Sequence, residues 1–123
     1  MPKSTYLRNR VLDAAFNAAT LNVTTAHLSL HTADPGLTGT SEVTGGSYAR
    51  QEIATGNASG GTLANTDVIA FDGMPAVTVT HVGVWDALTT GNFLYGKNVA
   101  AQKTYGAGDR AEVAIGAFTA TET

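Results

Sequence analysis

Between Val77 and Asp86 the chain runs Val-Thr-Val-Thr-His-Val-Gly-Val-Trp-Asp, an alternating stretch that contains its one tryptophan. Alternation with many β-branched residues is typical of a β-strand with two differently packed faces. A strict period of two would place Trp85 on one face together with Val77, Val79, His81 and Gly83. Val82 and Val84 would lie on the other face. We therefore predict a central structural strand here and not a catalytic segment.

The same period of two recurs on both sides of this strand. We expect further strands within residues 26–32, 48–54, 68–71, 93–99 and 111–121, with residues 37–47 as a surface loop. Glycine-rich turns separate these segments, and short strands at even spacing are typical of an antiparallel sandwich or barrel. The sequence thus predicts one mainly β domain over residues 1–123, with six to eight strands in residues 26–121.

The N-terminal segment has a different period. Ser4 is suited to cap a helix, and Leu7, Val11 and three alanines follow on one stripe, which predicts an amphipathic helix over residues 4–20. A lone helix beside a self-contained sandwich must cover an end or edge of the sheet, or dock on a neighbouring subunit. With its preceding arm it is our candidate docking element, and the candidate interface residues are Tyr6, Leu7, Arg10, Val11, Phe16 and Trp85.

Composition excludes several classes of function. Charged residues make up 14% of the chain, the formal net charge is −3, and there are no cysteines. The cations do not cluster beyond Lys3, Arg8 and Arg10, so we expect no nucleic-acid partner. No apolar run approaches the length of a membrane span, and no signal peptide is evident, so we expect synthesis in the host cytoplasm and no membrane contact. An uncharged surface favours oligomerisation, because few charges lose water on contact.

Catalytic, cofactor and metal sites are not indicated. His27 and His31 fall about 13 Å apart along one strand, too far to share a metal ion. The carboxylates are dispersed, and no nucleophile motif or phosphate-binding loop is present. Trp85 has two interpretations, packing in the core or at a subunit interface and stacking on a sugar; packing is favoured, because sugar sites usually gather several aromatic rings.

Several motifs together resemble a family of small bacteriophage virion proteins, described as tail-fibre-like or capsid-decorating. They are His31–Gly36 (HTADPG), Ser41–Gln51 (SEVTGGSYARQ), the segment from Ala64-Asn65 to Phe71, Val79–Ala87 (VTHVGVWDA) and the Gly106–Asp109 turn. The resemblance covers nearly the whole chain as far as Phe118. It implies a jelly-roll-like β-sandwich, a homotrimer and a place on the virion surface, and it carries over no catalytic residue.

From this resemblance we expect a non-enzymatic virion structural protein that binds the phage major capsid protein or other virion subunits. Decoration of the capsid head is the leading expectation. The alternative is a tail-fibre or tail-associated protein that binds a host-surface glycan, and a glycan hydrolase is a third, formal possibility. Burial of Trp85 would argue against the glycan role.

Overall fold

The computed structural model describes residues 3–121 and is mainly β with one helix, as predicted. Helix α1 (Thr5–Phe16) comes first, and the strands that follow are antiparallel to their partners. They are β1 (His27–His31), β2 (Gln51–Glu52), β3 (Thr62–Ala64), β4 (Ile69–Phe71), β5 (Val77–Trp85), β6 (Phe93–Tyr105), β7 (Ala111–Val113) and β8 (Thr119–Thr121).

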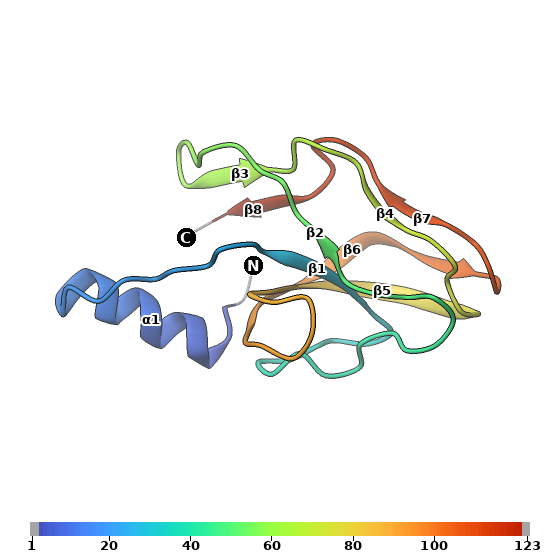
Figure 1. Ribbon diagram of the computed structural model, residues 1–123, viewed down its shortest axis with the longest axis horizontal. Helices are drawn as coiled ribbons and strands as arrows, with labels where there is room; N and C mark the ends of the chain where they lie inside the picture. The colour runs from blue at the N-terminus through green and yellow to red at the C-terminus, as the bar shows by residue number, and fades with distance from the viewer. Residues whose placement is uncertain (1–2, 122–123) are drawn as a thin grey trace.

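The largest sheet has four strands in the order β2-β1-β5-β6, and two small sheets pair β3 with β8 and β4 with β7. Figure 1 shows the small sheets stacked over the large one, with α1 projecting at one end of the molecule. The two long strands β5 and β6 form the base of this arrangement. The jelly-roll topology stays a prediction, since the small strands divide into separate pairs.

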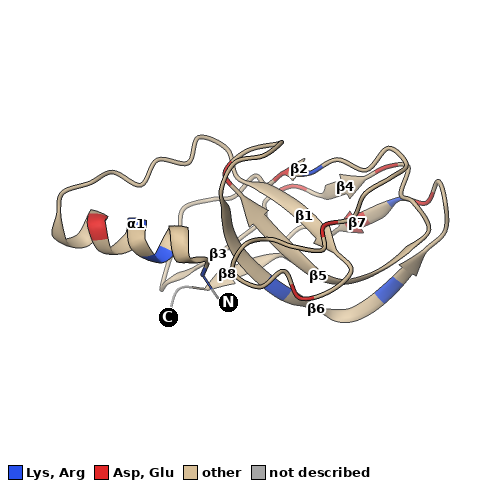
Figure 2. Cartoon of the chain, turned by 90° about the horizontal axis from the view of Figure 1, so that it is seen from below, with Lys and Arg blue, Asp and Glu red and all other residues tan. Residues whose placement is uncertain are grey.

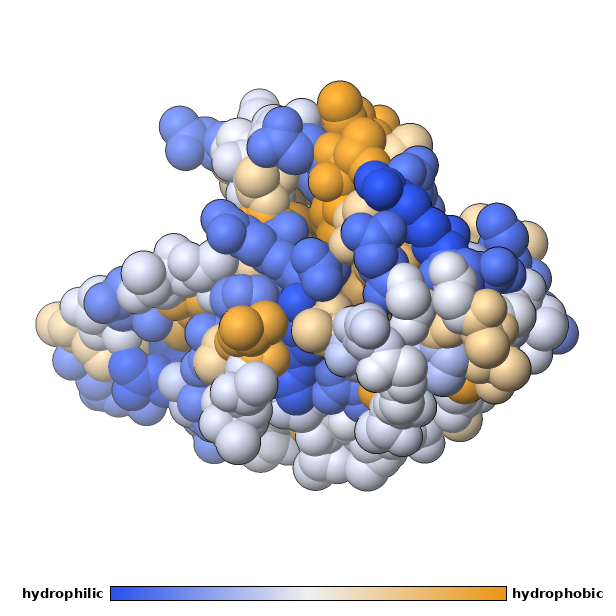
Figure 3. Space-filling model, turned by 45° about the vertical axis from the view of Figure 1, so that its right-hand side comes forward, coloured by the Kyte–Doolittle hydropathy of each residue, from blue (hydrophilic) through white to orange (hydrophobic). Residues whose placement is uncertain are grey.

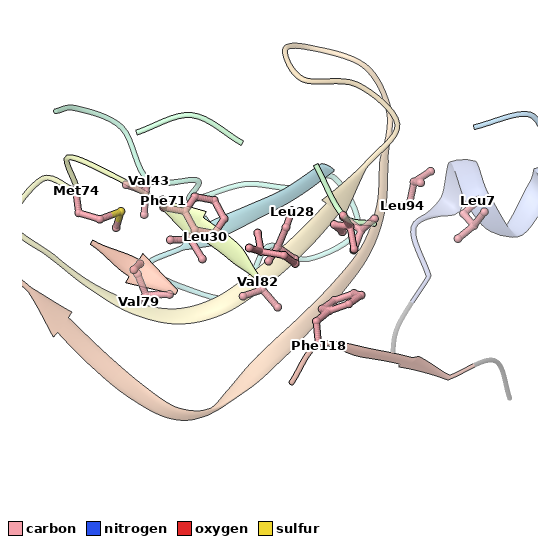
Figure 4. Packing of buried hydrophobic residues seen from close by; sticks show 14 residues of the cluster. Leu7, Leu28, Leu30, Val43, Phe71, Met74, Val79, Val82, Leu94 and Phe118 are labelled. Carbon is pink, nitrogen blue, oxygen red and sulfur yellow. The ribbon is translucent and has the colours of Figure 1, made fainter. Parts of the chain in front are cut away.

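The core lies between the large sheet and the small sheets. Leu28 and Leu30 from β1 and Val82 from β5 pack there with Phe71 and Phe118 from the opposite side (Figure 4). The Val82–Val84 face of β5 is therefore the one that meets the core. Each side chain of this size contributes about 1.5–3 kcal/mol when fully buried.

The prediction that Val77 and Val79 share the face of Trp85 is wrong. Val79 is buried in the same core cluster as Val82, and Val77 packs against that cluster. The cause is an irregularity in the β5–β6 pairing: the register changes between Val79 and His81. A bulge adds residues to one strand and so breaks the period of two.

The C-terminal strand predicted over residues 111–121 is interrupted, so that β7 and β8 belong to different sheets. Residues 114–117 form a turn in which Gly116 has a φ of 78°, a conformation that favours glycine. Asn65 is buried and holds this turn: its amide nitrogen donates to the carbonyls of Asp67 and Ala114, and its amide oxygen accepts from the backbone N–H of Phe118. Strand β3, which the sequence did not predict, pairs with β8 just beyond this point.

Helix α1 is shorter than predicted. Ser4 caps it, since its hydroxyl oxygen accepts from the backbone N–H of Leu7 at 3.1 Å, and Asn17 ends it. The Ser4 N–H donates to the carbonyl of Leu94 at 2.8 Å, which attaches the helix to the start of β6. The predicted apolar stripe is not buried, because Leu7 is the only buried residue of the helix.

Candidate functional site

Trp85 lies on the face of the large sheet that points away from the core, and it is 9% exposed. Its indole N–H donates to Ser29 Oγ at 2.9 Å. Ser29 Oγ lies 2.6 Å from His31 Nε2, and His31 Nδ1 lies 2.7 Å from the carbonyl oxygen of Thr40. A carbonyl only accepts, so Nδ1 carries the proton, Nε2 accepts from Ser29, and the chain of hydrogen bonds is complete with a neutral imidazole.

Burial lowers the pKa of His31 below its usual value, which agrees with that neutral form. Both ring nitrogens are engaged, so neither is available to a metal ion. His81 lies directly across from His31 in the β1–β5 pairing, as a cross-strand neighbour. Among residues 3–121, no group of three or more His, Asp or Glu side chains is placed to hold a metal ion.

Arg50 covers the Trp85 ring. Its guanidinium carbon lies 3.7 Å from the ring centroid, a cation–π contact. The same guanidinium binds both carboxylate oxygens of Glu42, with an Nη2–Oε1 distance of 2.9 Å, and donates to the carbonyls of Ala87 and Thr90. The two charged side chains are only 9% and 21% exposed, so the pair is largely removed from water. It ties the loop before β2 to the loop after β5.

Tyr48 joins this ion pair to the core. Its hydroxyl donates to Glu42 Oε2 at 2.8 Å and accepts from the backbone N–H of Leu30 at 3.0 Å. Its ring stacks on Phe71, with centroids 5.9 Å apart and planes within 6°. Burial is the main reason that the pKa of Tyr48 is raised above its usual value. The tyrosine hydroxyl therefore provides the acceptor for the Leu30 N–H of β1, at a position that β2 does not reach.

Two glycines, Gly83 and Gly39, leave room for the close packing of the side chains in this site. A Cβ on Gly83 would lie 2.7 Å from each of Ser29 Oγ, His31 Nε2 and a ring carbon of Phe93. A Cβ on Gly39 would lie 2.5 Å from the indole ring of Trp85. Phe93 meets that ring edge-on at 5.2 Å. The ring is thus enclosed by a cation, an aromatic edge and a backbone loop, and the face under Arg50 is not free to stack on a sugar.

We call the side chains of Ser29, His31, Glu42, Tyr48, Arg50, Trp85 and Phe93 the Trp85 cluster. An open cleft of about 400 Å³ borders it, lined by Glu42, Arg50 and the loop residues Leu88 and Thr89. Both carboxylate oxygens of Glu42 already accept hydrogen bonds inside the cluster. The arrangement is structural: it covers Trp85 on one face of the sheet and connects two loops.

The other candidate residues lie on α1. Leu7 is 3% exposed and packs in the core, so, like Trp85, it offers no free surface in this conformation. Tyr6 and Val11 are partly exposed, and Phe16 is 80% exposed. Arg10 donates from Nη2 to the carbonyl of Thr20, which folds the following segment back onto the helix.

Sequence reasoning missed the ion pair of Glu42 with Arg50. The signal was present: the two residues stand on either side of Gly45-Gly46, in a segment predicted to turn, and such a reversal brings its flanks together. Leu12 was not among the candidate interface residues, yet it is 56% exposed and stands one helical turn before Phe16.

The fold and the Trp85 cluster define a small mainly β structural domain that exposes a short helix at one end. A family model described as "Podophage GP4 fiber I protein gp80" matches residues 2–121. The chain belongs to this family of phage fibre proteins, and membership implies a virion component. No curated protein matches the chain. No helix within residues 3–121 is long and apolar enough to cross a membrane.

The family description speaks for the fibre alternative more than for capsid decoration. The burial of Trp85 argues against the sugar-stacking interpretation, which was attached to that alternative. The family match does not itself show that the motifs quoted in the sequence analysis are shared by the family.

Proposed function

We propose that the chain is a structural subunit of a phage tail fibre, without catalytic activity or cofactor. The match of the fibre family over residues 2–121 carries this proposal. The Trp85 cluster supports it, because the buried polar and charged side chains of the cluster already hydrogen-bond to one another. A domain of this kind contributes a rigid shape.

Contacts with other virion subunits are made, in this proposal, by the outer face of α1. Arg8, Leu12 and Phe16 stand at i, i+4 and i+8, which places them on one stripe of the helix. Leu12 and Phe16 are 56% and 80% exposed. A leucine and an aromatic at i and i+4 stabilise the helix by only about 0.2–0.5 kcal/mol. Exposed apolar surface of this kind is typical of a contact with another protein.

The experiment compares phage particles that carry the native chain with particles that carry Leu12→Ser plus Phe16→Ser. We expect the variant to fold normally and to be depleted at least about tenfold from purified particles, since truncated aromatic anchors dominate the loss of binding. Quantitative mass spectrometry of the particles measures the occupancy.

Leu37→Ser is the matched control, because Leu37 is 46% exposed and belongs to the loop between β1 and β2 and not to α1. The control should be incorporated at the native level. Full occupancy by the helix variant would overturn the assignment of α1 as the contact. A native chain missing from intact particles would overturn the virion role itself.

A further inference from the structure

A second exposed apolar surface lies at the ends of β4 and β7. Val68 directly precedes β4 and is 48% exposed, and Ile115 follows β7 and is 65% exposed. Because Ile69 pairs with Val113, Val68 and Ile115 both lie just beyond the same end of this strand pair. Figure 3 shows hydrophobic surface gathered over these linked loops. We call Asp67, Val68 and Ile115 the β4–β7 patch.

This patch is held rigidly. The buried side chain of Asn65 donates to the carbonyls of Asp67 and Ala114, one in each loop. The Gly116 N–H donates in turn to the carbonyl of Asn65 at 3.0 Å. A surface fixed before binding loses little conformational freedom on contact, which is a property of effective interfaces.

The N-terminal segment with the helix and the rest of the chain differ in the sign of their net charge. Within residues 3–16 there are three cations, Lys3, Arg8 and Arg10, against the single acid Asp13. Residues 17–121 carry four cations and eight acids. Figure 2 shows the acidic residues mainly along the sandwich, with Asp13 the single acid of α1. The helix and the sandwich are therefore complementary in charge, which favours contact between different copies.

We propose that α1 of one copy docks on the β4–β7 patch of a second copy. The stripe of Arg8, Leu12 and Phe16 would place its aromatic and leucine against Val68 and Ile115, and its guanidinium near Asp67. This inference deepens the proposed fibre function and rests on it, because a fibre needs a repeated contact between chains.

Other exposed aliphatic residues fit this partner less well. Leu37 and Leu88 stand on separate loops. The acids nearest to them in the sequence are bound within their own turns: Asp34 accepts from the Gly36 N–H, and Asp86 accepts from the backbone and side chain of Asn92. Neither leucine combines an apolar neighbour with an acid as the β4–β7 patch does.

The contact joins two different surfaces, and Figure 1 shows α1 and the β4–β7 loops well apart on one chain. One copy therefore cannot cover its own patch with its own helix. Such head-to-tail contacts either close into a ring or continue as a filament. In either form, the stripe on α1 of each interior chain would be buried against the next chain.

The first test measures self-association of the purified full chain by sedimentation velocity over a range of concentrations. Phe16→Ser should weaken association by about 30-fold, the loss typical of a central aromatic anchor. Arg8→Glu and Asp67→Arg should each weaken it by about tenfold through like-charge contact, and the double variant should recover most of the native affinity. Glutamate in the first turn suits the helix dipole, so Arg8→Glu leaves α1 intact.

The second test uses the fact that the chain has no cysteine. Phe16→Cys combined with Ile115→Cys should give intermolecular disulfides under mild oxidation, since bonding requires the two Cα atoms within about 7 Å. Phe16→Cys combined with Leu37→Cys is the control and should stay uncrosslinked.

A native chain that stays monomeric, charge reversals that do not rescue each other, or equal crosslinking in both cysteine pairs would each overturn the proposal. These results come from the purified chain alone. They are thus separable from failure of the virion role, which is read from particles.

Discussion

Replacing Arg50 with alanine is the most informative test of the Trp85 cluster. The change removes the guanidinium from the face of Trp85 and from both oxygens of Glu42, and it also abolishes the bonds to two loop carbonyls. The side chains of Arg50 and Glu42 are 9% and 21% exposed. Removing one member of so buried a pair leaves the other charge without its partner in a poorly solvated site.

Such a loss typically costs about 3–5 kcal/mol of the free energy of unfolding. Domains of this size are stable by about 5–15 kcal/mol, so the change removes a large share of the total. We expect the melting temperature to fall by roughly 10–20 °C.

Urea unfolding followed by tryptophan fluorescence is the assay, because the one tryptophan stands in contact with the substituted residue. Arg110→Ala is the control: its guanidinium pairs with Asp72 and Glu112, but all three side chains are more than half exposed. Its loss should cost less than about 1 kcal/mol.

A double-mutant cycle with Glu42→Ala separates the pair from its surroundings. Removing both partners should cost less than the sum of the two single changes, with a coupling of about 1–3 kcal/mol. A cost below about 1 kcal/mol for Arg50→Ala, with unchanged native fluorescence, would refute the structural role of the cluster.

Three further changes test other parts of the fold. Gly83→Ala should cost about 1–3 kcal/mol in urea unfolding, because its methyl group would overlap Ser29 and His31; an unchanged midpoint would contradict the close packing. The lowered pKa of His31 means that the unfolded chain binds the extra proton, so stability should fall as the pH drops below 6.5, by at most about 1.4 kcal/mol per pH unit. His31→Gln should flatten that slope between pH 7 and 5.5, and an unaltered slope would assign it to other groups. Asn65→Ala should cost about 2–3 kcal/mol by leaving the buried N–H of Phe118 without its acceptor, and a neutral effect would show that the turn is held otherwise.

Much of the fold could be predicted because local chemistry and tertiary packing agree there. The Val77–Asp86 stretch became β5 almost residue for residue, and Ser4 caps α1 as expected. Period and propensity act over neighbouring residues, so they are visible in one sequence.

The predictions were wrong where contacts between segments far apart in the sequence determine the structure. The break between β7 and β8 depends on Asn65, some 50 residues earlier in the chain, and no local pattern reveals that hydrogen bond. The register change between Val79 and His81 depends on the number of residues in the partner strand β6. Propensity cannot indicate either feature, because both are set by pairing across the fold.

Of the exposed stripe on α1, the sequence singled out Phe16 but not Arg8 or Leu12, because the period of a helix does not show which of its faces the rest of the fold covers. The enclosure of Trp85 requires Arg50, Phe93 and Gly39 to converge from separate loops and strands. The sequence favoured packing over sugar stacking for that ring. The contacts of the ring with Arg50 and Phe93 agree with packing.

A fibre subunit must lie on the fibres of the phage particle and not on its head. Imaging of purified particles, with the native chain labelled by gold-conjugated antibody, measures this position. We expect label on the fibres and bare heads. Label spread over the heads, with unlabelled fibres, would show that the chain is not a fibre subunit.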